Sequence, residues 1–178
     1  MDSLYSRYAS ALFSIALEEN QVDFYRKEIK VIRKIFLENE DLIHLFSSYF
    51  IDDKEKNDVV DKIFSNENIN IVNFIKIIIH NKRTISIIKI FDEFIKDCNQ
   101  HLKIKDGIIY SVNELNQKQI KDLEKAIEAK LNYQVELINV IDKKLIGGFK
   151  IQVEDQIFDG SIKNRLENLR NSLISGGN

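Results

Sequence analysis

Apolar residues in the first hundred positions recur with the period of an α-helix, and polar residues separate each apolar stretch from the next. The predicted helix starts are capped by Ser3, Asp52 or Asp53, and Thr84, and a short third helix follows Asn39. The pattern predicts six helices with inward positions at Leu4, Tyr8, Leu12 and Ile15; Tyr25, Ile29, Ile32 and Phe36; Leu42, Leu45, Phe46 and Tyr49; Val59, Val60, Ile63 and Phe64; residues 71–79; and Ile87, Ile88, Phe91, Phe94, Ile95 and Cys98. Six short helices with brief connections indicate an α-helical bundle.

The first and fifth helices are more apolar than a place in a bundle requires. The first has a second apolar stripe (Tyr5, Ala9, Phe13, Ala16), and the fifth, at 69–81, is apolar nearly all round. This surplus predicts a groove that accepts an amphipathic helix of another chain. It equally fits two helices at the centre of the bundle, because a helix without a polar face is normally buried. On the pattern alone, the central placement is slightly favoured.

Near Ile104 the period changes from that of helices to that of strands. Phe149, Ile151 and Val153 alternate with Lys150 and Gln152, which is the inward and outward alternation of a strand. Strands are predicted at 108–112, 135–141, 149–153 and 156–158, a helix after Asn116 with Ile120, Leu123, Ile127 and Leu131 on one face, and a last helix with Ile162, Leu166, Leu169 and Leu173. The predicted fold is therefore mainly α, with a six-helix bundle at 1–103 and a small α+β domain at 104–178.

Glycine is scarce, with six residues in the chain, yet Gly147-Gly148 and Asp159-Gly160-Ser161 lie close together. The spacing matches neither the dinucleotide fingerprint G-x-G-x-x-G nor the phosphate loop G-x-x-x-x-G-K-[ST]. The glycine pair precedes a strand instead of a helix, and Asp159 or Ser161 can satisfy the amides of the last helix as an N-cap. We therefore predict structural roles and no cofactor for both segments.

Composition and side-chain spacing favour a protein without a chemical site. The 26 basic and 28 acidic residues give a net charge of −2, which provides no long-range electrostatic field that would attract nucleic acid. Cys98 is the single cysteine and lies on an apolar helix face, so a buried side chain is expected rather than a nucleophile. His44, His80 and His101 have no partner at metal-ligand spacing. We predict no catalytic residue and no metal site.

The sequence also shows no membrane-targeting pattern. The first twenty residues lack a basic region followed by a long apolar run, so no signal peptide is expected. No segment reaches the roughly 18 uncharged apolar residues that a membrane span requires.

Three segments in the same order resemble a known family. SRYASALFSIALEEN (6–20), NFIKIIIHNKRTISIIKIFDEF (73–94) and the ending D-x-x-LIGGF…DGSIKNRLENL (142–169) are similar to the ATP synthase delta subunit family, which includes the mitochondrial oligomycin-sensitivity-conferring protein. The most specific element is LIGGF followed by DGS-[IV]-x-x-x-L. The resemblance covers essentially the whole chain.

The resemblance implies a non-catalytic peripheral-stalk subunit that connects the alpha/beta head of a proton-translocating ATP synthase to the membrane-anchored b subunits. In the family, a groove between the first and fifth helices binds the amphipathic N-terminal helix of an alpha subunit. Carried over by position, the partner-binding residues are Tyr8, Ala11, Leu12 and Ile77. The second domain meets the C-terminal ends of the b subunits. The implied location is peripheral, on the cytoplasmic face of the bacterial inner membrane or the equivalent organelle face.

Two departures and two alternatives accompany this resemblance. The family often has Pro near 142–145 and Gly in the hairpin turn, where this chain has Lys and Glu154-Asp155. The first alternative is an all-helical RNA-binding adaptor of the antitermination type, which the interspersed Lys and Glu residues disfavour. The second is a small enzyme whose polar cluster the sequence does not reveal.

Overall fold

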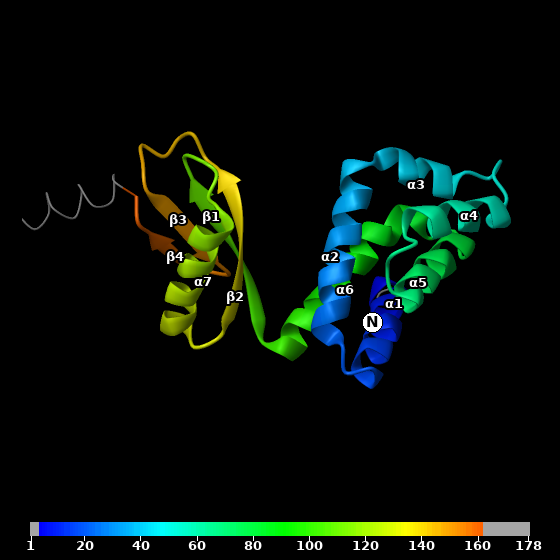
Figure 1. Cartoon of the computed structure of the whole chain (residues 1–178), viewed down its shortest axis with the longest axis horizontal. Helices are drawn as coiled ribbons and strands as arrows, with labels where there is room; N and C mark the ends of the chain where they lie inside the picture. Colours follow the sequence, from blue (N-terminus) through cyan, green and yellow to red (C-terminus); the bar gives the residue numbers. More distant parts are fainter. Residues whose placement is uncertain (1–3, 162–178) are drawn as a thin grey trace, which may run out of the picture. The chain divides into compact units, whose positions relative to one another are not determined.

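The computed structural model describes residues 4–161, and the chain divides into two compact units, Met1–Leu102 and Lys103–Asn178. The first unit contains helices α1 (Leu4–Glu18), α2 (Val22–Glu38), α3 (Glu40–Ser47), α4 (Asp53–Ile63), α5 (Ile69–His80), the 3-10 helix η1 (Thr84–Ser86) and α6 (Ile87–Leu102) (Figure 1). The predicted fold class, six helices followed by an α+β region, is confirmed. The predicted Ser3 cap and the last helix lie outside the described residues.

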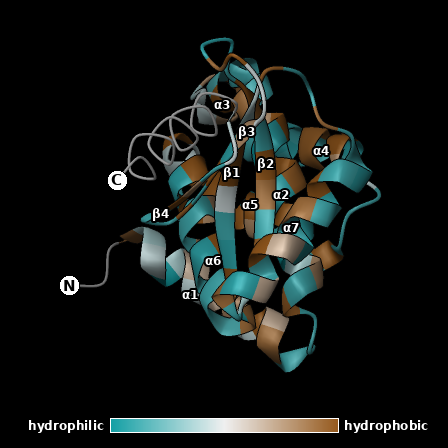
Figure 2. Cartoon of the chain, turned by 90° about the vertical axis from the view of Figure 1, so that its left-hand side faces the viewer, coloured by the Kyte–Doolittle hydropathy of each residue, from teal (hydrophilic) through white to brown (hydrophobic). Residues whose placement is uncertain are grey.

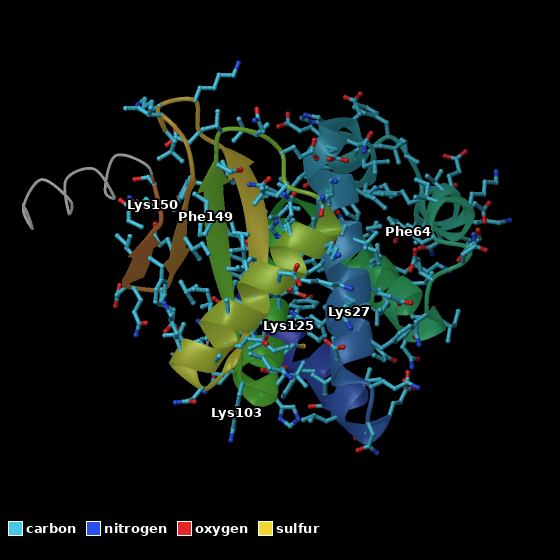
Figure 3. All side chains as sticks on the ribbon, turned by 60° about the vertical axis from the view of Figure 1, so that its left-hand side comes forward. Lys27, Phe64, Lys103, Lys125, Phe149 and Lys150 are labelled. Carbon is cyan, nitrogen blue, oxygen red and sulfur yellow. The ribbon has the colours of Figure 1, made fainter. Side chains whose placement is uncertain are left out.

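Helix α6 is the element on which the first unit is assembled. Both α1 and α2 pack against it, while α5 packs against α4. At the centre, the Phe36 ring of α2 lies about 6 Å from the rings of Phe46, Phe64 and Phe91, with centroid distances of 6.2, 6.0 and 6.0 Å. Phe64, at the end of α4, is labelled in Figure 3. These aromatic side chains come from four different helices and hold them around one apolar centre.

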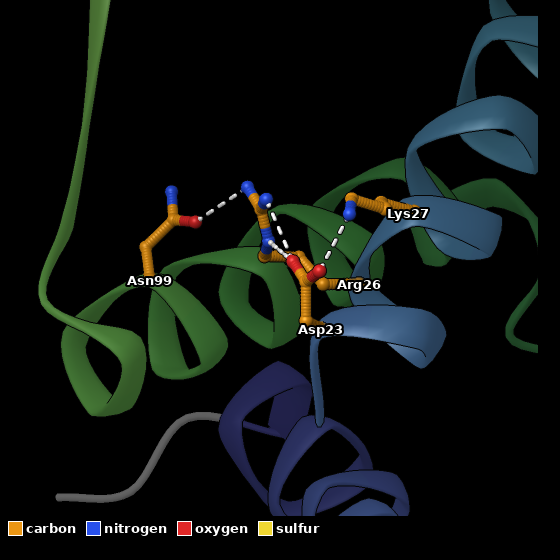
Figure 4. Close-up of polar contacts among 4 residues, drawn as sticks. All are labelled: Asp23, Arg26, Lys27 and Asn99. Atoms are coloured by element: carbon orange, nitrogen blue, oxygen red, sulfur yellow. Dashed lines mark hydrogen bonds and ion pairs between the residues drawn. The ribbon is translucent and has the colours of Figure 1, made fainter. Parts of the chain in front are cut away.

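One charged side chain is buried between α2 and α6. Arg26 is 2% exposed, and its guanidinium donates to Asp23 Oδ1 at 3.0 Å and to Asn99 Oδ1 at 3.1 Å (Figure 4). Lys27 Nζ lies 2.6 Å from the other oxygen of Asp23. Burial acts to raise the pKa of Asp23, but the hydrogen bonds and charges of Lys27 and Arg26 outweigh it and lower this pKa. The apolar periodicity gave no indication of this cluster.

Three predictions for individual residues in the first unit are wrong. Tyr49 is 82% exposed because α3 ends at Ser47 and Ser48 adopts an extended backbone, which takes Tyr49 off the helix face. Ile63 is 41% exposed, at the last turn of α4. Thr84 begins the 3-10 helix η1 with a buried side chain, so it is not the N-cap of α6.

The observed helix ends show which predicted caps are used. Asp52 caps α4 by accepting a hydrogen bond from the Glu55 amide at 2.7 Å. Asn39 precedes α3 but makes no side-chain cap, and its amide donates instead to the Ile35 carbonyl at 2.8 Å. Beyond α5, Lys82 has a left-handed φ of 56°, and its amide donates to the Ile79 carbonyl at 2.9 Å. This is the position where a helix usually ends in glycine.

The second unit is a four-stranded mixed sheet with one helix. Its elements are β1 (Ile104–Ser111), α7 (Gln117–Leu131), β2 (Gln134–Ile141), β3 (Phe149–Val153) and β4 (Gln156–Asp159). The strand order is β2-β1-β3-β4, with β1 and β2 parallel and the other neighbours antiparallel. Helix α7 is the crossover between the parallel strands, as a parallel pair requires. It begins with the predicted Asn116 cap, which forms a complete capping box with Gln119.

The core of this unit lies between α7 and one face of the sheet. Ile109, Ile151 and Val153 are buried there, together with Ile127 of α7. The predicted alternation of β3 is confirmed, since Ile151 and Val153 are buried and Gln152 is exposed. Helix α7 has both hydrophobic and hydrophilic residues in Figure 2, as a helix with one covered face does. Strand β1 begins four residues before the predicted start because pairing with β2 begins at Ile104.

The turn between β3 and β4 supplies a stability prediction. Glu154 has a left-handed φ of 50°, a conformation that costs a residue with a Cβ about 1–2 kcal/mol. Its carboxylate also pairs with Lys105 Nζ at 2.5 Å. We expect Glu154→Gly to raise the free energy of unfolding by about 1 kcal/mol relative to Glu154→Gln, because both variants lose the ion pair and only glycine relieves the backbone.

Amide hydrogen exchange in β1 and β3 during urea unfolding measures this difference for the second unit separately from the first. Equal protection in the two variants would contradict a strained turn.

Candidate functional site

The two glycine-containing segments, Gly147-Gly148 and Asp159-Gly160-Ser161, have a packing role. Gly148 has a φ of 81°, and a Cβ at this position would lie 2.5 Å from the Gly160 carbonyl oxygen. The Gly160 amide donates to the Phe149 carbonyl at 2.9 Å, next to Lys150 on the same strand (Figure 3). Asp159 Oδ1 accepts from the Ser161 amide at 2.9 Å, so the carboxylate takes up an amide that a phosphate loop would leave open. The two segments therefore fix one another.

The cysteine and two of the histidines, side chains that can react or bind a metal, are buried or contact other residues of the fold. Cys98 is fully buried on α6, and burial raises the pKa of its thiol to about 12. His80 Nδ1 lies 2.8 Å from Asp53 Oδ2, and the His101 ring contacts the edge of Phe13. Among residues 4–161, no group of three His, Cys, Asp or Glu side chains could hold a metal ion. Nor does any helix in this range combine the length and apolarity needed to cross a membrane.

A groove of about 470 Å³ lies between α1 and α5. It exists because α1 packs mainly on α6 and α2, while α5 packs mainly on α4, so neither helix packs mainly on the other. Its α1 wall repeats at positions 4, 7, 8, 11, 12 and 15, and its α5 wall at positions 70, 73, 74 and 77. Both walls follow the helical period, so each helix presents one continuous face to the groove.

Helix α1 has two apolar stripes because it meets two surfaces. One stripe faces α6, where Phe13 contacts His101 and Lys89 Nζ lies 5.7 Å from the centroid of the Tyr5 ring. The other stripe lines the groove. Helix α5 likewise buries Ile71, Ile75 and Ile78 in the core and presents another face to the groove. The surplus of apolar surface in the sequence corresponds to this open face.

The structure brings the four predicted partner-binding residues together in this groove: Tyr8, Ala11, Leu12 and Ile77. Leu12 is 0% exposed and forms the floor, whereas Ile77 is 51% exposed at the α5 rim. Ala11 is exposed and Tyr8 is half-buried. Arg7 is the one charged residue in the lining, with Asn70 and Asn73 opposite. The arrangement suits an apolar stripe of a second helix.

A polar network at one end of the groove was missed by the sequence analysis. Tyr25 Oη donates to Glu19 Oε2 at 2.7 Å, and the Asn70 side-chain amide donates both to Glu19 Oε1 at 2.8 Å and to Tyr25 Oη at 3.0 Å. Burial, followed by the bond to Glu19, raises the pKa of Tyr25. The network joins the end of α1 to the start of α5 and fixes their separation. No local pattern could have indicated it, because its members are far apart in the sequence.

Comparison with known proteins gives matches over nearly the whole chain. The family model described as ATP synthase delta (OSCP) subunit matches residues 4–173. ATP synthase subunit delta of Mycoplasma mobile is 41% identical over 168 residues, which cover 94% of this chain and 93% of the relative. The corresponding subunits of Mycoplasma capricolum and Oceanobacillus iheyensis are 34% and 30% identical, covering 97% and 95% of this chain and 97% and 94% of the relatives.

A chain in the structure titled "Cryo-EM structure of Toxoplasma gondii mitochondrial ATP synthase hexamer, composite model" has a similar fold. The TM-score is 0.62 at 20% identity, over 97% of this chain and 98% of that chain. The resemblance stated from the sequence is thus confirmed, and the family match gives no support to an RNA-binding adaptor.

The burial of Cys98 supplies a prediction about reactivity. Because the reactive species is the thiolate and burial raises the pKa of this thiol to about 12, native protein is expected to resist iodoacetamide at about pH 8. We expect labelling in the native state to be at least about a thousandfold slower than in denaturant, as measured by intact-protein mass spectrometry. Ser10→Cys, at an exposed position of α1, provides an accessible thiol in the same protein. Comparable rates at the two positions would disprove the assignment.

Proposed function

Because the chain belongs to the ATP synthase delta (OSCP) subunit family, a family of non-catalytic structural subunits, we propose that it links the alpha/beta catalytic head to the membrane-anchored b subunits. The family assignment itself implies a stator function in ATP synthesis and proton transport. A stator does no covalent chemistry: it binds at two ends and resists displacement while the rotor turns. We place the protein peripherally, on the cytoplasmic face of the bacterial membrane or its organelle equivalent, attached only through the complex.

The proposed contact with the head is the groove between α1 and α5, with the amphipathic N-terminal helix of an alpha subunit as its occupant. The observation that supports this most is the continuous helical-period lining of the groove on both walls. Such a lining matches a third helix, whose own apolar side chains recur with the same period. Tyr8, Ala11 and Leu12 form the α1 side, and Ile77 contributes the α5 rim.

The physical character of the groove fits a long-lived tether. Burying a large apolar side chain contributes about 1.5–3 kcal/mol, and Ile77 is half exposed before binding. Ala11 leaves room for a close helix approach because its side chain is a single methyl group. Since Arg7 is the one charged lining residue, added salt has few ionic contacts to screen.

For the second unit, we propose that the sheet face opposite α7 meets the C-terminal ends of the b subunits. Val135 and Leu137 point toward α7, so the alternating residues Ile138 and Val140 lie on the opposite face. These two side chains are 62% and 42% exposed, and Ile157 of β4 is 56% exposed. Exposed apolar residues gathered on one sheet face are typical of a protein-binding surface.

The groove assignment is tested by Tyr8→Asp and Ala11→Arg. Each change places a charge where the apolar stripe of the partner helix would be desolvated, so we expect at least about a hundredfold loss of affinity. The measurement is a fluorescence titration with a peptide corresponding to the alpha-subunit N-terminus.

Ser10→Arg is the matched control for this titration, because Ser10 is exposed on the same helix but is not part of the groove lining. Its affinity is expected to equal that of the unsubstituted protein, and circular dichroism confirms the fold of each variant. If Tyr8→Asp and Ala11→Arg bind as the control does, the groove is not the site.

The sheet-face assignment is tested by Ile138→Asp. We expect at least about a tenfold loss of affinity for a peptide from the C-terminal end of a b subunit, measured by isothermal titration calorimetry. Lys125→Asp is the control, since Lys125 is an exposed residue of α7 (Figure 3), on the other side of the sheet. Equal losses in the two variants would indicate a general charge effect and overturn this assignment.

A further inference from the structure

A second pocket, of about 280 Å³, lies beside the loop between α3 and α4. Its lining comes from the end of α3, from that loop, from Asp53 and Lys56 on α4, and from Lys82 and Ile85 after α5. It shares no lining residue with the groove between α1 and α5. The two surfaces are therefore separate and can be altered independently.

The ammonium group of Lys56 is buried at this pocket without a counter-ion. Lys56 is 7% exposed, and its Nζ donates to the Ser48 carbonyl at 2.6 Å. Within residues 4–161, Lys56 makes no ion pair. A buried charge is unfavourable unless an opposite charge and further hydrogen bonds accompany it.

The carboxylates of the pocket are already engaged elsewhere. Asp52 accepts from the Glu55 amide at 2.7 Å, and Asp53 Oδ2 lies 2.8 Å from His80 Nδ1. A second cation, Lys82, lies with its Nζ 5.2 Å from the centroid of the Tyr49 ring. The pocket thus presents two ammonium groups, and no carboxylate of the described residues is paired with either.

A hydroxyl group adds a second, independent indication of a missing polar partner. Ser47 Oγ is buried and has no hydrogen-bond partner within the described part of the chain. Buried polar atoms in native proteins are nearly always hydrogen-bonded, so an unpartnered one calls for an explanation. Ser47 lines the same pocket as the two lysines, and its hydroxyl can donate to the oxygen that they attract.

Large apolar side chains surround the pocket. The lining residues Tyr49 and Ile85 are 82% and 79% exposed, and Phe50, which follows Tyr49 in the chain, is 101% exposed. Tyr49 and Ile85 line the pocket, and with Phe50 beside Tyr49 in the chain they form an apolar rim, which is typical of a surface that a partner covers. The partner must therefore provide an apolar side chain next to its charged group.

We propose that this pocket binds an acidic side chain of a protein partner, in a segment where an aromatic or branched apolar residue adjoins the acid. The carboxylate accepts hydrogen bonds from Lys56, Lys82 and Ser47, and the adjoining residue packs on Tyr49 and Ile85. A carboxylate fits better than a phosphate of nucleic acid, because Asp52 and Asp53 at the same pocket and the net charge of −2 oppose a more highly charged ligand.

The test is an NMR titration of the full chain with two peptides, N-acetyl-Asp-Phe-amide and N-acetyl-Asn-Phe-amide. These peptides differ in the charge of one side chain and have nearly the same shape. We expect the Asp peptide to shift the amides of residues 47–56 and 82–85, and the Asn peptide to bind at least about tenfold more weakly. Equal affinities, or no shifts with either peptide, would overturn the proposal.

Variants separate the pocket from its surroundings. Lys82→Met is expected to weaken binding of the Asp peptide about tenfold without unfolding the chain, because Lys82 is exposed. Lys56→Met is expected to do the same, and Lys82→Met decides the matter if Lys56→Met does not fold. Lys54→Met, on an exposed position of α4 outside the pocket, is the control and should bind normally. Unchanged binding by Lys82→Met refutes the proposal.

Sedimentation velocity tests a different occupant. If the protein alone forms dimers and Phe50→Ser makes it monomeric, a second copy of this chain covers the rim, and the acidic-partner proposal is wrong. A monomer in both cases supports a separate partner. The outcome is independent of the groove, because neither peptide nor Phe50 involves the α1 and α5 walls.

Discussion

The separation between α1 and α5 is the constraint on which the first unit depends. Helix α1 packs on α6 and α5 packs on α4, so the gap between them is set by helices other than themselves. The bonds among Glu19, Tyr25 and Asn70 close this gap at one end with side chains from α2, from α5 and from the residue that follows α1. Along the rest of its length the groove is open, because α1 and α5 each present to it an apolar face that the neighbouring helices do not cover. An apolar groove of this kind persists only where the flanking helices are held by other contacts.

The apolar periodicity predicted most helices and strands correctly, because caps and apolar spacing depend on residues that are neighbours in the sequence. The capped start of α7 at Asn116 and the alternation of β3 required only neighbouring residues. The predictions fail where the chain leaves a regular element. Tyr49 continues the spacing of α3, but the helix ends at Ser47, and periodicity alone gives no length. Without proline in the chain, and with Lys82 where a helix-ending glycine is usual, the ordinary signals of a helix end are missing.

The candidate site was predictable only in part, for a related reason. The four groove residues lie at helical spacing in apolar stripes, and their surplus was visible from the sequence. Whether that surplus faced a groove or the core depended on packing between helices distant in the chain, and the resemblance to a family, not the pattern, favoured the groove. The polar network, the buried Arg26 and the pocket beside Lys56 join residues from different helices. Side chains of these types are common on helix surfaces, so nothing in the local sequence distinguishes those that become buried.

The occupants proposed for the groove and for the pocket beside Lys56 would make two physically different kinds of attachment in one small unit. Contact in the groove removes apolar surface from water and has little ionic character, since Arg7 is its one charged lining residue. Contact at the pocket relies on two ammonium groups and a hydroxyl, so its strength falls as salt screens the exposed Lys82. A stator benefits from the first kind of contact. The apolar side chains of a helix bound in a groove must leave it together, so dissociation is slow. The second kind selects orientation, because a carboxylate must reach a buried ammonium whose position on α4 is fixed.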